Sequence, residues 1–240
     1  MRLTVRDVMD PDPVTVTTRT SFKELVALLT REGLSAVPVL SRSGEVAGIV
    51  TEADLLRKQG FQSAGVGTPR PVRRAYRARW ARATGDCAGE VMSTHPVTIS
   101  PEATVAEAAR LMERQHCRCL PVTDQSGKLA GTVTARDLLR VFLRLDSEIA
   151  EDVTREILAG RFAAAPGSVT ADVADGVITI SGQVRRKSML PQVLAVIRDI
   201  DGVVDVEGQL TYAIDDTRAL EKPEVPPRAS AAGSRERKQA

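Results

Sequence analysis

Apolar residues in the first part of the chain follow two different periods. Within residues 22–31 they recur every three or four positions, which predicts a helix with one apolar face. Short apolar runs at 36–40 and 46–50 follow, and a Ser-Gly pair separates them as in a hairpin. A second helix is expected from Thr51. With an extended segment at 13–16, the pattern predicts a β-α-β-β-α unit.

The same pattern returns further along the chain. Residues 8–57 align with residues 91–140 at a constant offset of 83 without a gap, and about twenty of the fifty pairs are identical. Such a duplication determines the architecture before other features are considered. Because about fifty residues bury too little apolar surface to fold alone, we expect the two copies to pack together as a pseudo-two-fold pair.

Residues 146–214 carry a different pattern. A helical period is followed by two apolar runs joined by Asp175-Gly176, which is a strong hairpin signal. A second apolar helix face and a final strand complete the segment. The fold class expected for the whole chain is mixed α/β (α+β). The predicted order here is α-β-β-α-β, with elements at 147–158, 168–173, 177–184, 190–197 and 203–212.

Charge and composition divide the chain further. The net charge of +2 conceals a basic segment at 58–87, with seven basic residues and one acidic residue, and an acidic segment at 146–214, with six and eleven. Glycine and proline mark the basic segment as a linker, and the composition of the C-terminal segment is typical of disorder. The expected divisions are a first repeat at 1–57, a linker at 58–87, a second repeat at 88–145, a separate domain at 146–214 and a disordered tail at 215–240.

The composition argues against several classes of protein. No apolar run approaches the ~18–20 residues that cross a bilayer, and the N-terminal residues lack the apolar stretch of a secretory signal, so a cytoplasmic protein is expected. The three cysteines are an odd number, which favours reduced thiols over disulfides. The sequence shows no nucleophile and base pair, no phosphate-binding loop and no catalytic carboxylate pair. It therefore does not predict an enzyme.

A Gly-x-x-Thr-x-x-Asp motif occurs once in each repeat, where a strand is expected to meet a helix. It runs from Gly48 through Thr51 to Asp54, and again from Gly131 to Asp137. A carboxylate there can accept hydrogen bonds from both ribose hydroxyls, and a threonine hydroxyl beside free helix N–H groups suits a phosphate. Glycine would let the backbone approach a planar base. The same spacing also forms a capping box that needs no ligand, and both interpretations stay open.

The repeats resemble a pair of CBS domains, often called a Bateman module. The resemblance rests on Val-Met-x(3)-Pro-Val-Thr, on Pro-Val and on Gly-x-Val-Thr-x-x-Asp-Leu-Leu, each present twice within residues 5–145. It implies a regulatory module that requires no cofactor and whose cleft binds AMP, ADP, ATP or S-adenosylmethionine. It also implies a homodimer.

The same resemblance implies specific ligand contacts. Thr51 and Asp54 in the first repeat, and Thr134 and Asp137 in the second, would contact phosphate and ribose. The base would lie against Thr15, Ala36, Val37 and Pro38 in the first repeat, and against Thr98, Cys119, Leu120 and Pro121 in the second.

The two predicted clefts differ in charge. Ser35 and Ala53 of the first repeat correspond to Arg118 and Arg136 of the second. Because arginine makes bidentate contacts with phosphate, we expect nucleotide to bind mainly in the second repeat. The alternative is that both arginines point to solvent.

Residues 146–214 resemble a BON domain. The matching motifs are Asp175-Gly-Val-Ile-Thr-Ile-Ser-Gly-Gln-Val184 and Ile200-Asp-Gly-Val-Val-Asp-Val206. This resemblance implies contact with phospholipid or with protein. Since each basic residue near an anionic membrane contributes about 1 kcal/mol to binding, an acidic domain is poorly suited to lipid. We therefore expect that this domain relays ligand binding to an unidentified protein partner.

Other interpretations compete with that of a ligand sensor. The chain could be an interaction scaffold that works without ligand. Residues 73–82 interleave arginines with Tyr76 and Trp80, a composition suited to single-stranded nucleic acid, although a linker that contacts protein accounts for it as well. His116, Cys117 and Cys119 have the wrong spacing for a zinc knuckle, so no metal is expected.

Overall fold

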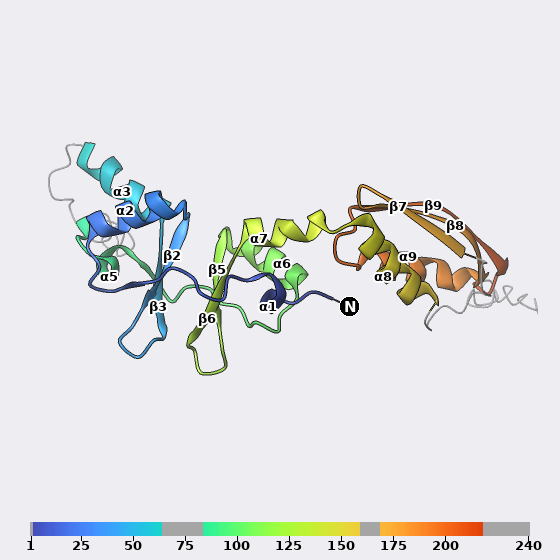
Figure 1. The fold of residues 1–240 in the computed structure, drawn as a ribbon, viewed down its shortest axis with the longest axis horizontal. Helices are drawn as coiled ribbons and strands as arrows, with labels where there is room; N and C mark the ends of the chain where they lie inside the picture. Colours follow the sequence, from blue (N-terminus) through green and yellow to red (C-terminus); the bar gives the residue numbers. More distant parts are fainter. Residues whose placement is uncertain (1, 64–83, 159–168, 218–240) are drawn as a thin grey trace, which may run out of the picture. The chain divides into compact units, whose positions relative to one another are not determined.

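The computed structural model describes residues 2–63, 84–158 and 169–217, and Figure 1 shows its elements. They form two compact units, one built from residues 1–149 with the short turn 200–202, and one from the rest. The arginine-rich run at 73–82 and the tail from 218 onward lie outside the described residues. None of the described helices is long and apolar enough to cross a membrane.

The first repeat has the predicted β-α-β-β-α order. Its first strand is parallel to the second, with Val16 paired to Val39, and the hairpin that follows is antiparallel. The last helix runs beyond the predicted boundary at residue 57, because Lys58 packs inward and donates to the Gly85 carbonyl at 2.8 Å. The elements are β1 (Val16–Thr17), α2 (Phe22–Glu32), β2 (Ala36–Leu40), β3 (Val46–Thr51) and α3 (Glu52–Ser63).

The second repeat reproduces this arrangement. Ile99 bridges Val122 in parallel, as Val16 pairs with Val39 in the first repeat. Its first helix ends at His116 in the left-handed conformation (φ 52°), where the first repeat has Gly33. The elements are α6 (Val105–Gln115), β5 (Cys119–Thr123), β6 (Leu129–Thr134), α7 (Ala135–Leu139) and the 3-10 helix η1 (Arg140–Leu143).

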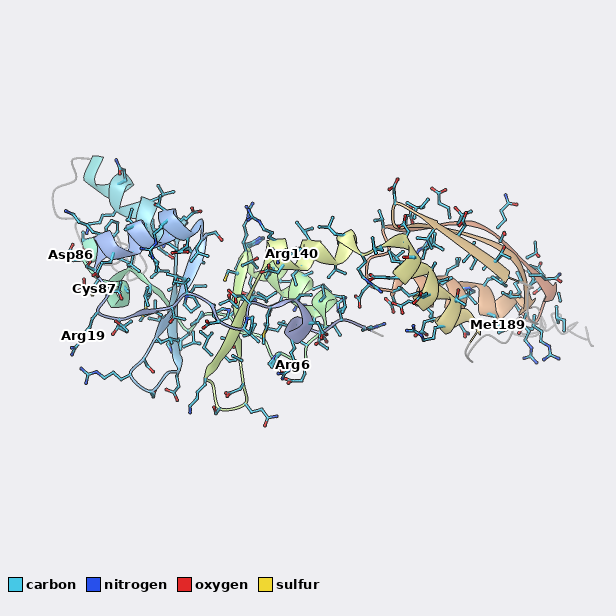
Figure 2. The ribbon with its side chains drawn as sticks, viewed as in Figure 1. Arg6, Arg19, Asp86, Cys87, Arg140 and Met189 are labelled. Atoms are coloured by element: carbon cyan, nitrogen blue, oxygen red, sulfur yellow. The ribbon has the colours of Figure 1, made fainter. Side chains whose placement is uncertain are left out.

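The two repeats exchange their first segments, which the sequence patterns did not predict. Helix α1 (Val5–Val8) belongs to the first repeat in sequence, yet Val5 is fully buried in the core of the second. Helix α5 (Ala88–Val91) does the reverse, with Val91 in the core of the first repeat. In Figure 1 the dark blue α1 lies beside the green second repeat, and Figure 2 places Arg6 and Cys87 accordingly. Each core is therefore completed by the other repeat.

The exchanged segments also complete the sheets. Strand β4 (Ser93–Thr94) pairs with Gly48 and Ile49 of β3, and Asp10 bridges Thr132 of β6 in the same way. A Cβ atom at Gly48 would lie 2.8 Å from the Ser93 carbonyl oxygen, and one at Gly131 would lie 2.5 Å from that of Asp10. The close approach of the exchanged backbone therefore accounts for both glycines without a ligand, and the predicted contact with a base stays a prediction.

The C-terminal unit has the predicted α-β-β-α-β order. Its three-stranded sheet has the order β7-β8-β9, and Ile178, Ile180 and Val184 of the central strand are buried. Asp215 accepts a hydrogen bond from Lys187 at 2.8 Å, so residues placed in the predicted disordered tail are bound to this unit. The elements are α8 (Asp146–Leu158), β7 (Val169–Ala174), β8 (Val177–Arg186), the 3-10 helix η2 (Lys187–Met189), α9 (Leu190–Arg198) and β9 (Asp205–Ile214).

Candidate functional site

Strand register brings the predicted cleft residues of each repeat together. Ala36 at the start of β2 lies opposite Thr51 at the end of β3. Cys119 lies opposite Thr134 in the second repeat. The helix that carries the aspartate begins directly after each threonine. Both predicted sites therefore lie at the same strand-to-helix junction.

Both Thr-x-x-Asp motifs form capping boxes. The Asp54 Oδ2 accepts from the Thr51 N–H at 2.9 Å and from the Thr51 hydroxyl at 2.6 Å. The Asp137 Oδ2 accepts from the Thr134 N–H at 2.9 Å and from its hydroxyl at 2.5 Å. The cap thus occupies one oxygen of each carboxylate, and any ligand contact falls to the other oxygen, Oδ1.

The surroundings of the aspartate Oδ1 atom differ between the two repeats. The Arg57 guanidinium lies 2.5 Å from Asp54 Oδ1, and the Asp54 side chain is only 2% exposed. Its counterpart Arg140 lies 3.6 Å from Asp137 Oδ1, and the Asp137 side chain is 15% exposed. A guanidinium already holds the first carboxylate at hydrogen-bond distance, whereas 3.6 Å is outside that range for N–H···O. The carboxylate of the second repeat is the more accessible to a ligand.

Exposed arginines lie beside the carboxylate of the second repeat. The Ala135 N–H donates to the Arg118 carbonyl at 2.9 Å, which places Arg118 next to the start of α7. Arg118 and Arg136 are both exposed, and neither forms an ion pair within the described part of the chain. Figure 2 shows Arg140, the third arginine, at the end of the same helix.

One further difference was missed by the sequence analysis. Glu52, exposed at the start of α3, corresponds to Ala135 in the second repeat. The constant offset of 83 that revealed Ala53 and Arg136 could also have revealed this pair. The first cleft therefore has an acidic residue where the second has none.

The residues predicted to line the base are not equally accessible. Pro38 and Pro121 are buried, Ala36 and Thr15 are half-buried, and Thr98 is exposed. Val37 and Leu120 have no exposed surface, and both belong to the cores of their repeats. Their side chains face apolar neighbours, so the prediction that they contact a base holds at most for their backbone.

Comparison with known families agrees with this geometry. A model of the CBS domain matches residues 5–60 and 88–144, and a model of the BON domain matches residues 145–214. The chain is a tandem CBS-domain protein with a C-terminal BON domain. Both resemblances inferred from the motifs are thereby confirmed.

Several proteins share the CBS pair. The uncharacterized protein MK0525 of Methanopyrus kandleri is 28% identical over 150 residues, which are 62% of this chain and 65% of that protein. The chloroplastic CBS domain-containing protein CBSX1 of Arabidopsis thaliana is 24% identical over 52% of this chain and 57% of its own length. The chain thus spans less than two thirds of the length of either relative. The crystal structure of CBSX2 in complex with AMP superimposes with a TM-score of 0.53 and 27% identity, over 58% of this chain and 96% of that chain.

The cysteines of the second CBS domain lie close to its cleft. Burial, together with the neighbouring Cys117 and Asp137, raises the pKa of the Cys119 thiol to about 12. Burial also raises the pKa of Cys117. A protonated thiol is a poor nucleophile and a poor metal ligand. Within residues 2–63, 84–158 and 169–217, no three His, Cys, Asp or Glu side chains are grouped as a metal site requires.

The first CBS domain also has a depression of about 670 Å³ between α2 and α3. Lys58 lies there, 2.7 Å from Asp86 Oδ1 and 4.6 Å from the centre of the Phe22 ring. None of the predicted ligand contacts lines this depression, so it does not represent the predicted cleft. Its lining residues are Ser21, Phe22, Lys23, Val26, Ala27, Leu55, Lys58, Gln59 and Asp86.

Proposed function

We propose that this protein is a regulatory sensor that binds an adenosine-containing ligand, and that the second CBS domain is its principal site. The observation that carries the proposal is the difference between the two carboxylates. Asp137 Oδ1 is accessible and 3.6 Å from its arginine, whereas Asp54 Oδ1 is buried against Arg57. The crystal structure of the similar CBSX2 in complex with AMP supports the choice of ligand class.

Ribose is the part of the ligand that Asp137 would recognise. A carboxylate oxygen accepts hydrogen bonds and so matches the two hydroxyls of a ribose. Such a ligand would have Cys119, Pro121 and Thr98 as the neighbours of its base. The first cleft, with the corresponding residues Thr15, Ala36 and Pro38, would bind more weakly, because a ligand there has to displace Arg57 from Asp54.

The chain offers a direct route from this cleft to the BON domain. Helix α7 carries Asp137, η1 follows with Arg140, and the BON match begins at residue 145. A ligand bound by Asp137 would change the pairing with Arg140 at the end of α7. The acidic charge of the BON domain favours a protein partner over a membrane. In energetic terms, the ligand acts only if it binds one arrangement of the chain better than another.

Self-association is part of the proposal. Leu56 on α3 and Leu139 on α7 occupy equivalent positions, and they are 69% and 64% exposed. Phe142 and Leu143 are exposed beside Leu139. Clustered large apolar side chains at a surface mark an interface, and a second copy of the chain in the cytoplasm would cover them.

The melting temperature tests the proposal. AMP or ATP at millimolar concentration should raise it, since a ligand at one hundred times its Kd stabilises the folded state by about 2.7 kcal/mol. Ribose 5-phosphate at the same concentration is the control that lacks the base. The capping boxes satisfy both motifs without a ligand, which favours the competing scaffold function. Unchanged melting with every adenosine compound would contradict the sensor and leave the scaffold as the better account.

A further inference from the structure

We infer that the second CBS cleft selects nucleoside di- and triphosphates over AMP and over S-adenosylmethionine. This inference rests on the proposed function and adds the charge class of the ligand. Its basis is the presence of three exposed arginines, Arg118, Arg136 and Arg140, on or next to the helix that carries the partly exposed Asp137.

The group is held by backbone geometry as well as by sequence. The hydrogen bond from Ala135 N–H to the Arg118 carbonyl (2.9 Å) fixes Arg118 beside the first turn of α7. Arg136 is the next residue of that turn, and Arg140 begins η1 one helical turn later. Arg118 and Arg136 are exposed, and the Arg140 side chain is 68% exposed. Three exposed arginines thus lie on or next to α7, the helix that carries Asp137.

The first cleft shows that the fold itself does not require these charges. It has the same strand pairing and the same capping box, yet Ser35 and Ala53 replace two of the arginines and Glu52 adds a negative charge. Over five matched positions the formal charge is −1 in the first cleft and +2 in the second. The five pairs are Ser35 and Arg118, Glu52 and Ala135, Ala53 and Arg136, Asp54 and Asp137, and Arg57 and Arg140.

The positive charge of the second cleft should favour ligands that carry more phosphate groups. AMP offers one phosphate, whereas ADP and ATP extend one or two further phosphates toward the guanidinium groups. Each bidentate arginine–phosphate contact is charge-assisted and specific in geometry. S-adenosylmethionine carries a sulfonium, an ammonium and one carboxylate group, so its net charge is positive and the arginines disfavour it relative to a nucleotide. Since each exposed ionic contact strengthens binding only a few-fold, two contacts correspond to about a tenfold preference for ATP over AMP.

Titration calorimetry on the full chain with ATP, ADP, AMP and S-adenosylmethionine tests the inference, with EDTA present so that no divalent cation neutralises the phosphates. The informative variant is R118S/R136A, which installs the residues that the first CBS domain carries at the same positions. The matched control is R19S/R42A, which removes two exposed arginines from the first CBS domain and changes the net charge equally.

We expect ATP to bind about tenfold more tightly than AMP, ADP to bind with an affinity between the two, and S-adenosylmethionine to bind most weakly. R118S/R136A should abolish the preference for ATP, because it weakens the binding of ATP more than that of AMP, while R19S/R42A keeps the preference. If AMP or S-adenosylmethionine binds as tightly as ATP, or if R118S/R136A keeps the preference, the inference is overturned and the proposed function is retained. If none of the four compounds binds, the proposed function fails and the inference fails with it.

Discussion

The two CBS domains of this chain have the same backbone and differ in what their side chains leave accessible. In both, a Thr-x-x-Asp capping box follows the end of a strand, and the distance from the threonine N–H to the aspartate Oδ2 is 2.9 Å. In the first, the Arg57 guanidinium lies 2.5 Å from the buried Asp54, and in the second, Asp137 is more exposed and Arg140 lies 3.6 Å away. A duplicated fold can therefore keep its structural hydrogen bonds in both copies while the exposure of the carboxylate differs between them.

Among substitutions that compare the two CBS domains, the largest effect on stability is expected from the glycines where the exchanged segments cross. Gly131→Ala would place a Cβ atom 2.5 Å from the Asp10 carbonyl oxygen, and overpacking of this kind costs about 1–3 kcal/mol. Gly48→Ala should cost less, because its neighbour at 2.5 Å is the flexible Met92 side chain and the rigid Ser93 carbonyl oxygen lies farther away, at 2.8 Å. Urea unfolding of both variants measures the difference.

Gly60→Ala is the matched control for these two variants. Gly60 lies in α3, and a Cβ atom added there would meet no neighbour within 4 Å, so the position has room for a methyl group. Alanine should stabilise that helix by up to about 1 kcal/mol. Equal and small effects of all three substitutions would show that the exchanged segments do not cross as described.

The exchange predicts that a mutation in one repeat weakens the other. Val5→Ala removes a fully buried side chain from the core of the second domain, and Val91→Ala removes one from the core of the first. Each should cost about 2 kcal/mol, which is the scale for burying a valine side chain. Hydrogen exchange should accelerate in β5 and β6 for Val5→Ala, and in β2 and β3 for Val91→Ala. Acceleration within the mutated repeat alone would contradict the exchange.

A smaller difference is expected in the response of the two domains to alkaline pH. The pKa of Cys119 is about 12 in the folded chain, whereas an unfolded thiol ionises near pH 8.5. The unfolded state therefore loses its proton first, and folding stability should fall as pH rises from about 8.5 toward 12, by about 1–2 kcal/mol at pH 10. The pKa of the Cys117 thiol is also raised.

Cys119→Ala provides the control for this pH effect, because Ala36 stands at the equivalent position of the first domain. The variant should lose most of the decline in stability between pH 9 and pH 10, as measured by urea unfolding. An unchanged decline would show that Cys119 is not the group responsible.

Most of the fold could be predicted from periodicity, because each helix and hairpin of the repeats carries its own apolar pattern. Strand β2 was predicted with its observed limits, and the ends of α2 and α6 agree within one residue. The exchanged helices were missed, since four residues are too few to show a period. Their burial depends on Val5 and Val91 meeting cores that are distant in sequence.

The candidate site was only partly predictable for a related reason. The motif located Thr51, Asp54, Thr134 and Asp137, and the strand register does bring them to equivalent junctions. Arg57 and Arg140 are the same residue at matched positions, so no sequence comparison of the repeats could show that one pairs closely and the other does not. That difference depends on how deeply each carboxylate is buried.

Titration calorimetry of Asp54→Asn and Asp137→Asn with ATP tests the central claim most directly. Both substitutions keep the side-chain volume and remove the charge. We predict that Asp137→Asn weakens binding at least tenfold, while Asp54→Asn retains the affinity of the unaltered chain and lowers its stability by about 1–2 kcal/mol. Loss of binding in Asp54→Asn alone, with full affinity in Asp137→Asn, would contradict the account.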